Sequence, residues 1–210
     1  MRIVIIVIFF LFCSTHAFNQ EKNFYLTKIL LVNNADTIQL NVMAYSNLWK
    51  PKKVDERYFS EGVTYIKNVE RKTIPSSKIK YLEFVDLESN KRCFINSGII
   101  RQSVDLEQIP QNGYSYMMEE KIKGKVSWYR TYKTNLYDGG SMAEETFIKD
   151  GELVTVGLYN SLKHKLTLLM SDDKEIVELI KKTKFSTWSL KKLDNQMKEI
   201  ISLYNEKSVK

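Results

Sequence analysis

The sequence predicts an α+β fold. A mainly antiparallel β-sheet, built from hairpins over about residues 24–156, is followed by three amphipathic C-terminal helices packed on it. Two observations predict this class. Apolar and polar residues alternate along much of the first three quarters of the chain, which is typical of half-buried strands. After Leu158 the apolar period changes to that of a helix, so strands and helices are segregated along the chain.

The first seventeen residues have the layout of a secretory signal peptide. Arg2 gives a positive start, the segment 3–12 is an unbroken apolar run, and Thr15-His16-Ala17 is a small-residue cleavage site. The run is shorter than the roughly 20 residues that a permanent membrane span needs. We therefore expect cleavage after Ala17, export, and a single α+β domain over 18–210.

The composition of the mature chain indicates a soluble globular protein. The whole sequence has 43% hydrophobic residues, enough for a real core, and no second run approaches the length of a membrane span. Cleavage removes Arg2 from the 32 Lys and Arg and none of the 25 Asp and Glu, so the net charge falls from +7 to +6. Since these charges are interspersed, they indicate a mixed solvated surface.

The strand region opens with a predicted hairpin. Its segments are 24–32 and 37–44, and they flank the turn cluster Asn33-Asn34-Ala35-Asp36. Residues 46–62, with Pro51 and several charges, are predicted as a loop, and 63–68 as a short strand.

The middle of the chain contains the next hairpin and two less regular stretches. Residues 79–87 carry apolar side chains on both faces, which is typical of a central strand, and they turn into a second strand at 91–96. Residues 97–113 look irregular, and 114–123 fit either a strand or a short helix.

The clearest strand pattern covers residues 124–132. Val126, Trp128, Arg130 and Tyr132 share one of its faces. A third hairpin follows at 145–148 and 153–156, because Asp150-Gly151 suits a turn in which both central residues have positive φ.

Three helical segments close the chain. Their apolar residues recur every three or four positions, and we expect N-caps at Ser171-Asp172-Asp173 and at Ser189. The apolar positions are Tyr159, Leu162, Leu166 and Leu169 in the first, Ile176, Val177, Leu179 and Ile180 in the second, and Leu190, Leu193, Met197, Ile200, Ile201 and Tyr204 in the third.

Few residues of the mature chain suit catalysis or metal binding. Cleavage leaves one cysteine, Cys93, which we expect to act as a small buried hydrophobe, and one histidine, His164, which we expect on a helix surface. Serine and cysteine hydrolases depend on a histidine base, and zinc sites need several Cys or His ligands at short spacing. We therefore expect no metal and no cofactor, and we favour a protein without enzymatic activity.

Two-carboxylate glycoside hydrolysis remains as an alternative, because it needs no histidine. The adjacent pairs Glu119-Glu120 and Glu144-Glu145 are predicted to point to opposite faces of their strands as solvated charges. No pair is singled out by the sequence.

Aromatic residues near the glycine-rich loop 137–141 form the predicted binding surface. Aromatic rings stack on sugars and fill pockets in partner proteins. The candidate binding residues are Tyr114, Tyr116, Tyr129, Arg130 and Tyr137, with Tyr114, Tyr116 and Tyr129 expected to be exposed. Nucleic acid is not an expected partner, because an exported protein rarely meets it.

Two segments resemble uncharacterised small exported proteins of Bacteroidota-type bacteria. Gly124-Lys125-Val126-Ser127-Trp128-Tyr129-Arg130 is similar to a glycine-led strand in such proteins. The tail, from Asp173-Lys174-Glu175-Ile176-Val177 through Ile200-Ile201-Ser202-Leu203-Tyr204-Asn205, resembles their closing helices, which often end in Tyr-Asn. The resemblance implies a cell-envelope setting and no particular activity. We see no C-terminal sorting domain after the last helix, so we expect the periplasm. An extracellular protein, or one lipid-anchored by cleavage before Cys13, is the less favoured alternative.

The leading hypothesis is a soluble, exported binding protein of the cell envelope with a protein or a glycan as ligand. The alternatives are a histidine-independent hydrolase of envelope polysaccharide and a structural or assembly subunit, which would expose a large apolar patch. The sequence does not specify the oligomeric state.

Overall fold

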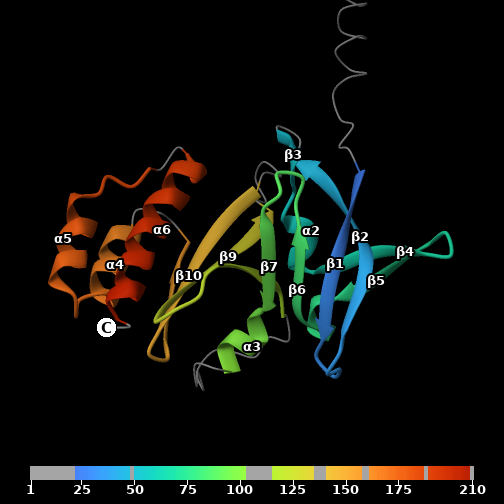
Figure 1. Cartoon of the computed structure of the whole chain (residues 1–210), viewed down its shortest axis with the longest axis horizontal. Coiled ribbons are helices and arrows are strands. Elements are labelled where there is room, and N and C mark those ends of the chain that lie inside the picture. The colour runs from blue at the N-terminus through green and yellow to red at the C-terminus, as the bar shows by residue number, and fades with distance from the viewer. Residues whose placement is uncertain are drawn as a thin grey trace, which may run out of the picture.

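A computed structural model describes residues 22–47, 50–102, 115–134, 141–157, 161–186 and 189–208. The predicted signal peptide and Ala17 lie outside these ranges. The described residues form one eleven-stranded antiparallel sheet and several helices, so the predicted α+β class is confirmed (Figure 1). The strands are β1 (Lys22–Leu31), β2 (Thr37–Asn47), β3 (Lys50–Val54), β4 (Gly62–Lys67), β5 (Glu70–Pro75), β6 (Ile79–Val85), β7 (Lys91–Asn96), β8 (Met117–Ile122), β9 (Val126–Thr134), β10 (Ser141–Lys149) and β11 (Glu152–Val156).

The strand order is β11-β10-β9-β8-β7-β6-β1-β2-β4-β5, and β3 pairs with β2 beside this path. The three predicted hairpins are confirmed as β1–β2, β6–β7 and β10–β11. In the last of these, Asp150 and Gly151 have φ values of 50° and 83°, as the turn chemistry requires. Consecutive strands therefore lie side by side over most of the sheet.

Three predictions for the connecting regions need correction or refinement. The predicted loop 46–62 contains β3 and the short helix α2 (Arg57–Ser60). The stretch predicted as irregular from Ser97 begins with helix α3 (Ser97–Gln102), and the ambiguous segment 114–123 contains β8. The 3-10 turn η1 (Ser76–Lys78) links β5 to β6.

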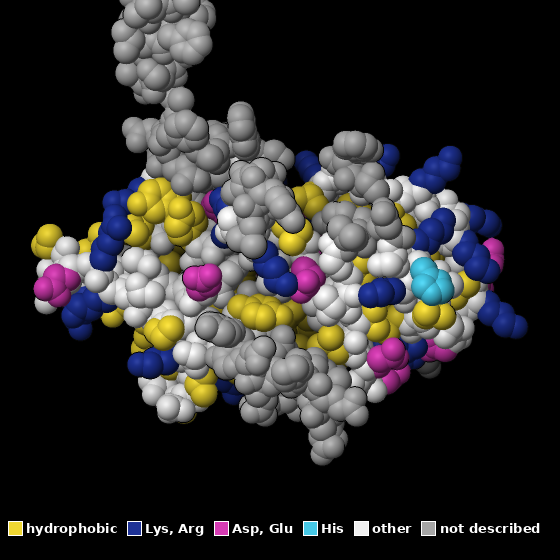
Figure 2. Space-filling view, turned by 180° about the vertical axis from the view of Figure 1, so that it is seen from behind, with side chains coloured by type: hydrophobic (Ala, Val, Ile, Leu, Met, Phe, Trp, Pro, Cys, Tyr) yellow, Lys and Arg dark blue, Asp and Glu magenta, His cyan; other side chains and the backbone are white. Residues whose placement is uncertain are grey.

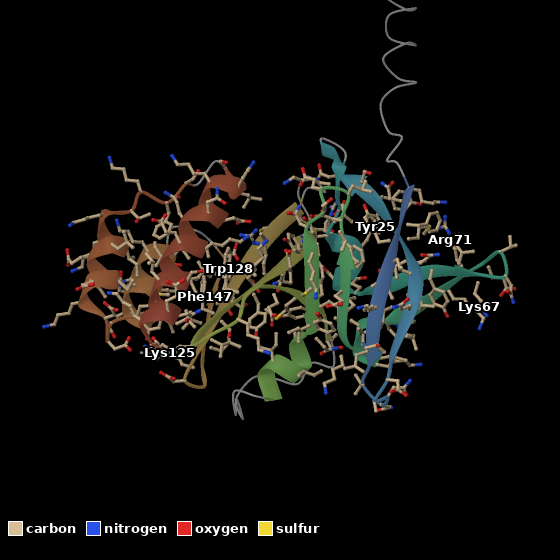
Figure 3. The ribbon with its side chains drawn as sticks, in the orientation of Figure 1. Tyr25, Lys67, Arg71, Lys125, Trp128 and Phe147 are labelled. Atoms are coloured by element: carbon tan, nitrogen blue, oxygen red, sulfur yellow. The ribbon has the colours of Figure 1, made fainter. Side chains whose placement is uncertain are left out.

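The sheet buries side chains on both faces. On one face, one core combines strands β1, β2, β6 and β7 with α2, whose Phe59 stacks on Phe84 and Phe94 with ring centroids 4.5 and 5.4 Å apart. A second core on that face lies between β9–β11 and the C-terminal helices and includes Trp128 and Phe147 (Figure 3). Alternate residues of the same strands, such as Tyr129, face a smaller cluster beneath α3.

The C-terminal helices are α4 (Leu162–Leu169), α5 (Lys174–Lys182) and α6 (Leu190–Lys207). The prediction that the helices pack on the sheet is confirmed in part. α4 lies against β11 and α6 against β8 and β9, whereas α5 packs mainly on α4 and α6. The predicted caps are present, because Asp173 accepts hydrogen bonds from the backbone of α5 and Ser189 accepts one from α6.

The two segments that carry the sequence resemblance contact each other. Asn205 of α6 accepts a hydrogen bond from Val126 N (2.8 Å) and donates one to Val126 O (3.0 Å), so its amide pairs with the start of β9 as a neighbouring strand would. A Cβ on Gly124 would overlap Asn205 Nδ2, so glycine leaves room for this contact. Next to it, the Tyr204 hydroxyl bonds the Asp172 carboxylate at 2.8 and 2.9 Å.

Replacing Asn205 with alanine is expected to lower the free energy of unfolding by about 2 kcal/mol, because both backbone groups of Val126 lose their partner. Urea denaturation measures the change. Glu206→Ala is the matched control, since Glu206 is the exposed neighbour on the same helix and should change stability by less than about 0.5 kcal/mol. Equal losses in the two variants would contradict the role of the Asn205 contact.

Candidate binding surface

Of the five predicted binding residues, the three that the structure describes do not form one exposed surface. Tyr114 and Tyr137 lie outside the described residues. Tyr116 and Tyr129 do come together, but in the cluster beneath α3, where they pack with Ile100 and Met118. Tyr129 is only 7% exposed, and burial raises its pKa. The expectation that Tyr129 is exposed is therefore wrong, because α3 covers that face of β9.

Arg130 lies on the opposite face of β9 from Tyr129 and is 3% exposed. Its Nε donates to Glu145 Oε1 at 2.8 Å, and its Nη1 and Nη2 donate to the two carboxylate oxygens of Asp194 at 3.1 and 2.6 Å. The guanidinium is thus held between β10 and α6. Arg130 is therefore a buried structural residue and not part of an exposed binding surface.

Arg130 belongs to a set of charged residues, here called the ionic row, that crosses the sheet. The register places Glu119 of β8, Arg130 of β9 and Glu145 of β10 side by side, at 3%, 3% and 0% exposure. Along β9, Arg130 falls between Trp128 of one core and Tyr132 of the other. The ionic row therefore separates the two apolar cores on this face.

Further charges surround Glu119. Arg92 Nε donates to Glu119 Oε1 at 2.6 Å, and the Tyr132 hydroxyl donates to the other oxygen of the same carboxylate. Lys121 lies 3.4 Å from Glu119 and 3.5 Å from Asp194, which connects the row to α6. The prediction that Glu119 and Glu145 are solvated is wrong. Both carboxylates are buried, and they form ion pairs with Arg92 and Arg130.

The two glutamates differ in their pKa values. Burial alone would raise the pKa of Glu119, but Arg92 and Lys121 outweigh it and lower that pKa to about 2. Burial dominates at Glu145 and raises its pKa despite the neighbouring Arg130. Divergent pKa values are typical of acid–base pairs, but a glycosidase needs substrate between its carboxylates. Here Arg130 stands between them, so the ionic row is a poor hydrolytic site.

A surface depression of 460 Å³ lies at the start of α5 and the end of α6, and Lys125, Asp172, Asp173, Glu175 and Lys207 contribute to its lining. Its acids already have partners. Asp172 binds Lys149 at 2.7 Å and Lys125 at 3.2 Å, besides Tyr204. Glu175 binds Lys207 at 2.5 Å, and Asp173 caps α5. These contacts explain the depression as part of the folded scaffold.

His164 is exposed on α4, as predicted. Figure 2 shows it among the Lys and Arg side chains at the helical end of the molecule. Within the described ranges, no group of three His, Cys, Asp or Glu is placed to hold a metal ion. None of the described helices is long and apolar enough to cross a bilayer.

The sheet exposes an apolar patch on its other face, away from α2. Phe24 and Leu26 of β1 are 49% and 64% exposed and alternate with buried Tyr25. β1 pairs with β6 through Lys28 and Glu83, and extending this antiparallel register by two residues places Leu26 opposite Val85. Val85 is 58% exposed. We call Phe24, Leu26 and Val85 the open-face patch.

Polar groups border the open-face patch on one side. Glu83 lies 3.5 Å from Lys28 and 2.8 Å from Lys91, whose side chains are 55% and 64% exposed. Hydrogen bonds from Lys91 and Tyr81 lower the pKa of Glu83 to about 2, so this carboxylate stays charged. With two lysines against one glutamate, the border of the patch carries a net positive charge.

Comparison with known proteins gives no relative to guide the interpretation. No family model, no curated protein and no solved structure matches the chain.

Proposed function

We propose that this chain is a soluble binding protein, exported to the periplasm after cleavage at Ala17, whose ligand is a protein of the cell envelope. The open-face patch is the observation that carries the proposal. Its three side chains are about half exposed or more and lie on the same face of neighbouring strands. Apolar residues that gather on a surface in this way are typical of protein interaction sites.

The chemistry of the patch favours a protein over a glycan. Sugar rings are recognised by aromatic platforms and polar hydrogen-bonding groups, whereas Leu26 and Val85 are aliphatic. The basic border at Lys28 and Lys91 favours a partner surface that is apolar at its centre and acidic at its rim. In this proposal α2 covers the opposite face of β1 and β6, and α4 and α6 pack on the other end of the sheet as a scaffold.

The hydrolase and assembly alternatives have less support. The ionic row places Arg130 between its two glutamates, and the depression beside α5 contains acids that already have partners. A structural subunit would require a larger apolar surface than these three residues supply. Binding by the open-face patch is therefore the function that the geometry supports best.

A photo-crosslinking residue in place of Leu26 tests this proposal. The same residue in place of Leu168, which is 60% exposed on α4, is the control. In envelope extract we expect one protein to crosslink from position 26 and not from position 168. Purified, that protein should bind residues 18–210, and Leu26→Asp should weaken binding by about tenfold or more, whereas Leu168→Asp should not.

Circular dichroism should show that both aspartate variants remain folded. The proposal fails if no protein crosslinks specifically from position 26, or if the captured protein binds the Leu26→Asp variant as tightly as the unchanged chain.

A further inference from the structure

Strands β4 and β5 form a hairpin that extends beyond the sheet (Figure 1). β4 pairs with β2 only through Tyr65 and Thr64, whereas its pairing with β5 continues to Lys67 and Glu70. Residues 66–71, here called the arm tip, therefore pair only with each other within the described sheet. A two-stranded hairpin has little stability of its own. Packing within the chain therefore does not account for this extension.

The turn of the arm tip has an unfavourable residue. Asn68 and Val69 have φ values of 52° and 69°, the pattern of a turn that favours glycine at its second position. Valine is β-branched and rarely adopts positive φ. Val69 is also 96% exposed, so no packing in the folded chain compensates for this conformation. A side chain that is both strained and exposed points to a role outside the fold.

Cations flank Val69 on both faces of the hairpin. Ile66, which is 45% exposed, pairs with Arg71, and Lys67 pairs with Glu70, so Arg71 and Lys67 project to opposite faces (Figure 3). Glu70 lies 3.8 Å from Lys72, its neighbour on the same face. No ion pair of Lys67 or Arg71 is found among the described residues. The arm tip thus presents an aliphatic end with two cations around it.

We propose that the arm tip docks on an anionic bilayer surface, with Val69 entering the interface and Lys67 and Arg71 contacting lipid phosphates. The tip offers a protein partner one fully exposed aliphatic side chain, Val69, between two cations, which is little apolar surface for an interface that buries about 800 Å² on each partner. A bilayer accepts a convex apolar tip, and long cationic side chains reach its headgroups while their stems lie along apolar surface. The net charge of the tip favours anionic lipid.

Membrane docking goes beyond the proposed function, because it concerns a different surface. The open-face patch lies on β1 and β6, whereas the arm tip lies beyond β2. The protein partner and the bilayer are thus contacted by different residues, and each contact is tested by its own variants.

Co-sedimentation of residues 18–210 with vesicles tests the proposal. One set of vesicles contains phosphatidylcholine alone. The other contains phosphatidylcholine with about 30% phosphatidylglycerol, an anionic lipid. We expect binding to the anionic vesicles only, with loss in high salt. Lys67→Glu/Arg71→Glu should reduce binding at least tenfold, since each cation near an anionic surface contributes about fivefold. Lys191→Glu/Lys192→Glu, an exposed pair on α6, is the charge-matched control.

Val69→Gly separates docking from folding. Glycine suits the positive φ of the turn, so this variant should be at least as stable as the unchanged chain to urea. It should nevertheless bind anionic vesicles up to about tenfold more weakly, because the apolar side chain is gone. Equal binding by Val69→Gly, equal binding to neutral vesicles, or no effect of the Lys67→Glu/Arg71→Glu change would overturn the proposal. Loss of a crosslinked protein partner on the arm-tip substitutions, without vesicle binding, would assign the tip to a protein contact instead.

Discussion

Replacing Arg130 with alanine is expected to lower the free energy of unfolding by about 3–5 kcal/mol. Arg130 is 3% exposed and holds carboxylates from two different elements, Glu145 of β10 and Asp194 of α6. Without the guanidinium, the fully buried Glu145 keeps an uncompensated charge or must take up a proton. Urea denaturation followed by far-ultraviolet circular dichroism measures the loss.

The matched control for Arg130→Ala is Lys133→Ala on the same strand. Lys133 makes a 2.9 Å ion pair with Glu144, but its side chain is 43% exposed, so its loss should change stability by less than about 1 kcal/mol. A double variant, Arg130→Met/Glu145→Leu, should recover part of the stability because it removes the unpaired charge as well. Similar losses for Arg130→Ala and Lys133→Ala would show that the ionic row does not stabilise the fold.

Much of the fold was predictable because its signals are local. The turn at Asp150-Gly151 needs positive φ at both positions, and the dipeptide Asp-Gly is itself the sequence signal for such a turn. The caps at Asp173 and Ser189 are equally local, since each side chain bonds backbone groups two or three residues further along. Hairpins and caps therefore follow from short stretches of sequence.

Two strands were missed because their own residues do not favour a strand. β3 has the sequence Lys-Pro-Lys-Lys-Val, and the outer strand β5 reads Glu-Arg-Lys-Thr-Ile-Pro. β3 becomes a strand by pairing with β2, and β5 by pairing with β4. This pairing supplies partners for their backbone groups, although their side chains do not favour a strand. Edge strands with charges and proline are common because such residues discourage further pairing.

The candidate site was less predictable, because alternation tells which side chains share a face but not what covers that face. Tyr129 and Arg130 were correctly placed on opposite faces of β9, yet both are buried. α3 covers one face and α6 reaches the other, and the partner Asp194 lies 64 residues away along the chain. The open-face patch also depends on a register between β1 and β6, which the sequence does not reveal.

Acidification is expected to remove about 3 kcal/mol of stability through Glu119 alone. In the folded chain its pKa is lowered from 4.5 to about 2, so the folded state favours the charged carboxylate. This contribution is fully present above about pH 5 and is lost as the pH falls towards 2, where the folded form also takes up the proton. Glu119 is 3% exposed, so solvent screening reduces the effect little.

Glu119→Gln isolates this contribution, because Glu83 and other paired carboxylates also titrate in acid. The variant should be less stable than the unchanged chain at pH 7, and the difference should shrink as the pH falls to 3. Glu145→Gln should show the opposite trend: the pKa of Glu145 is raised from 4.5 in the folded state, so the unchanged chain should gain stability relative to this variant as the pH falls. Urea midpoints of the unchanged chain and of both variants, measured from pH 7 to pH 3, test these two trends. A constant difference between Glu119→Gln and the unchanged chain would mean that Glu119 is not held charged by Arg92 and Lys121.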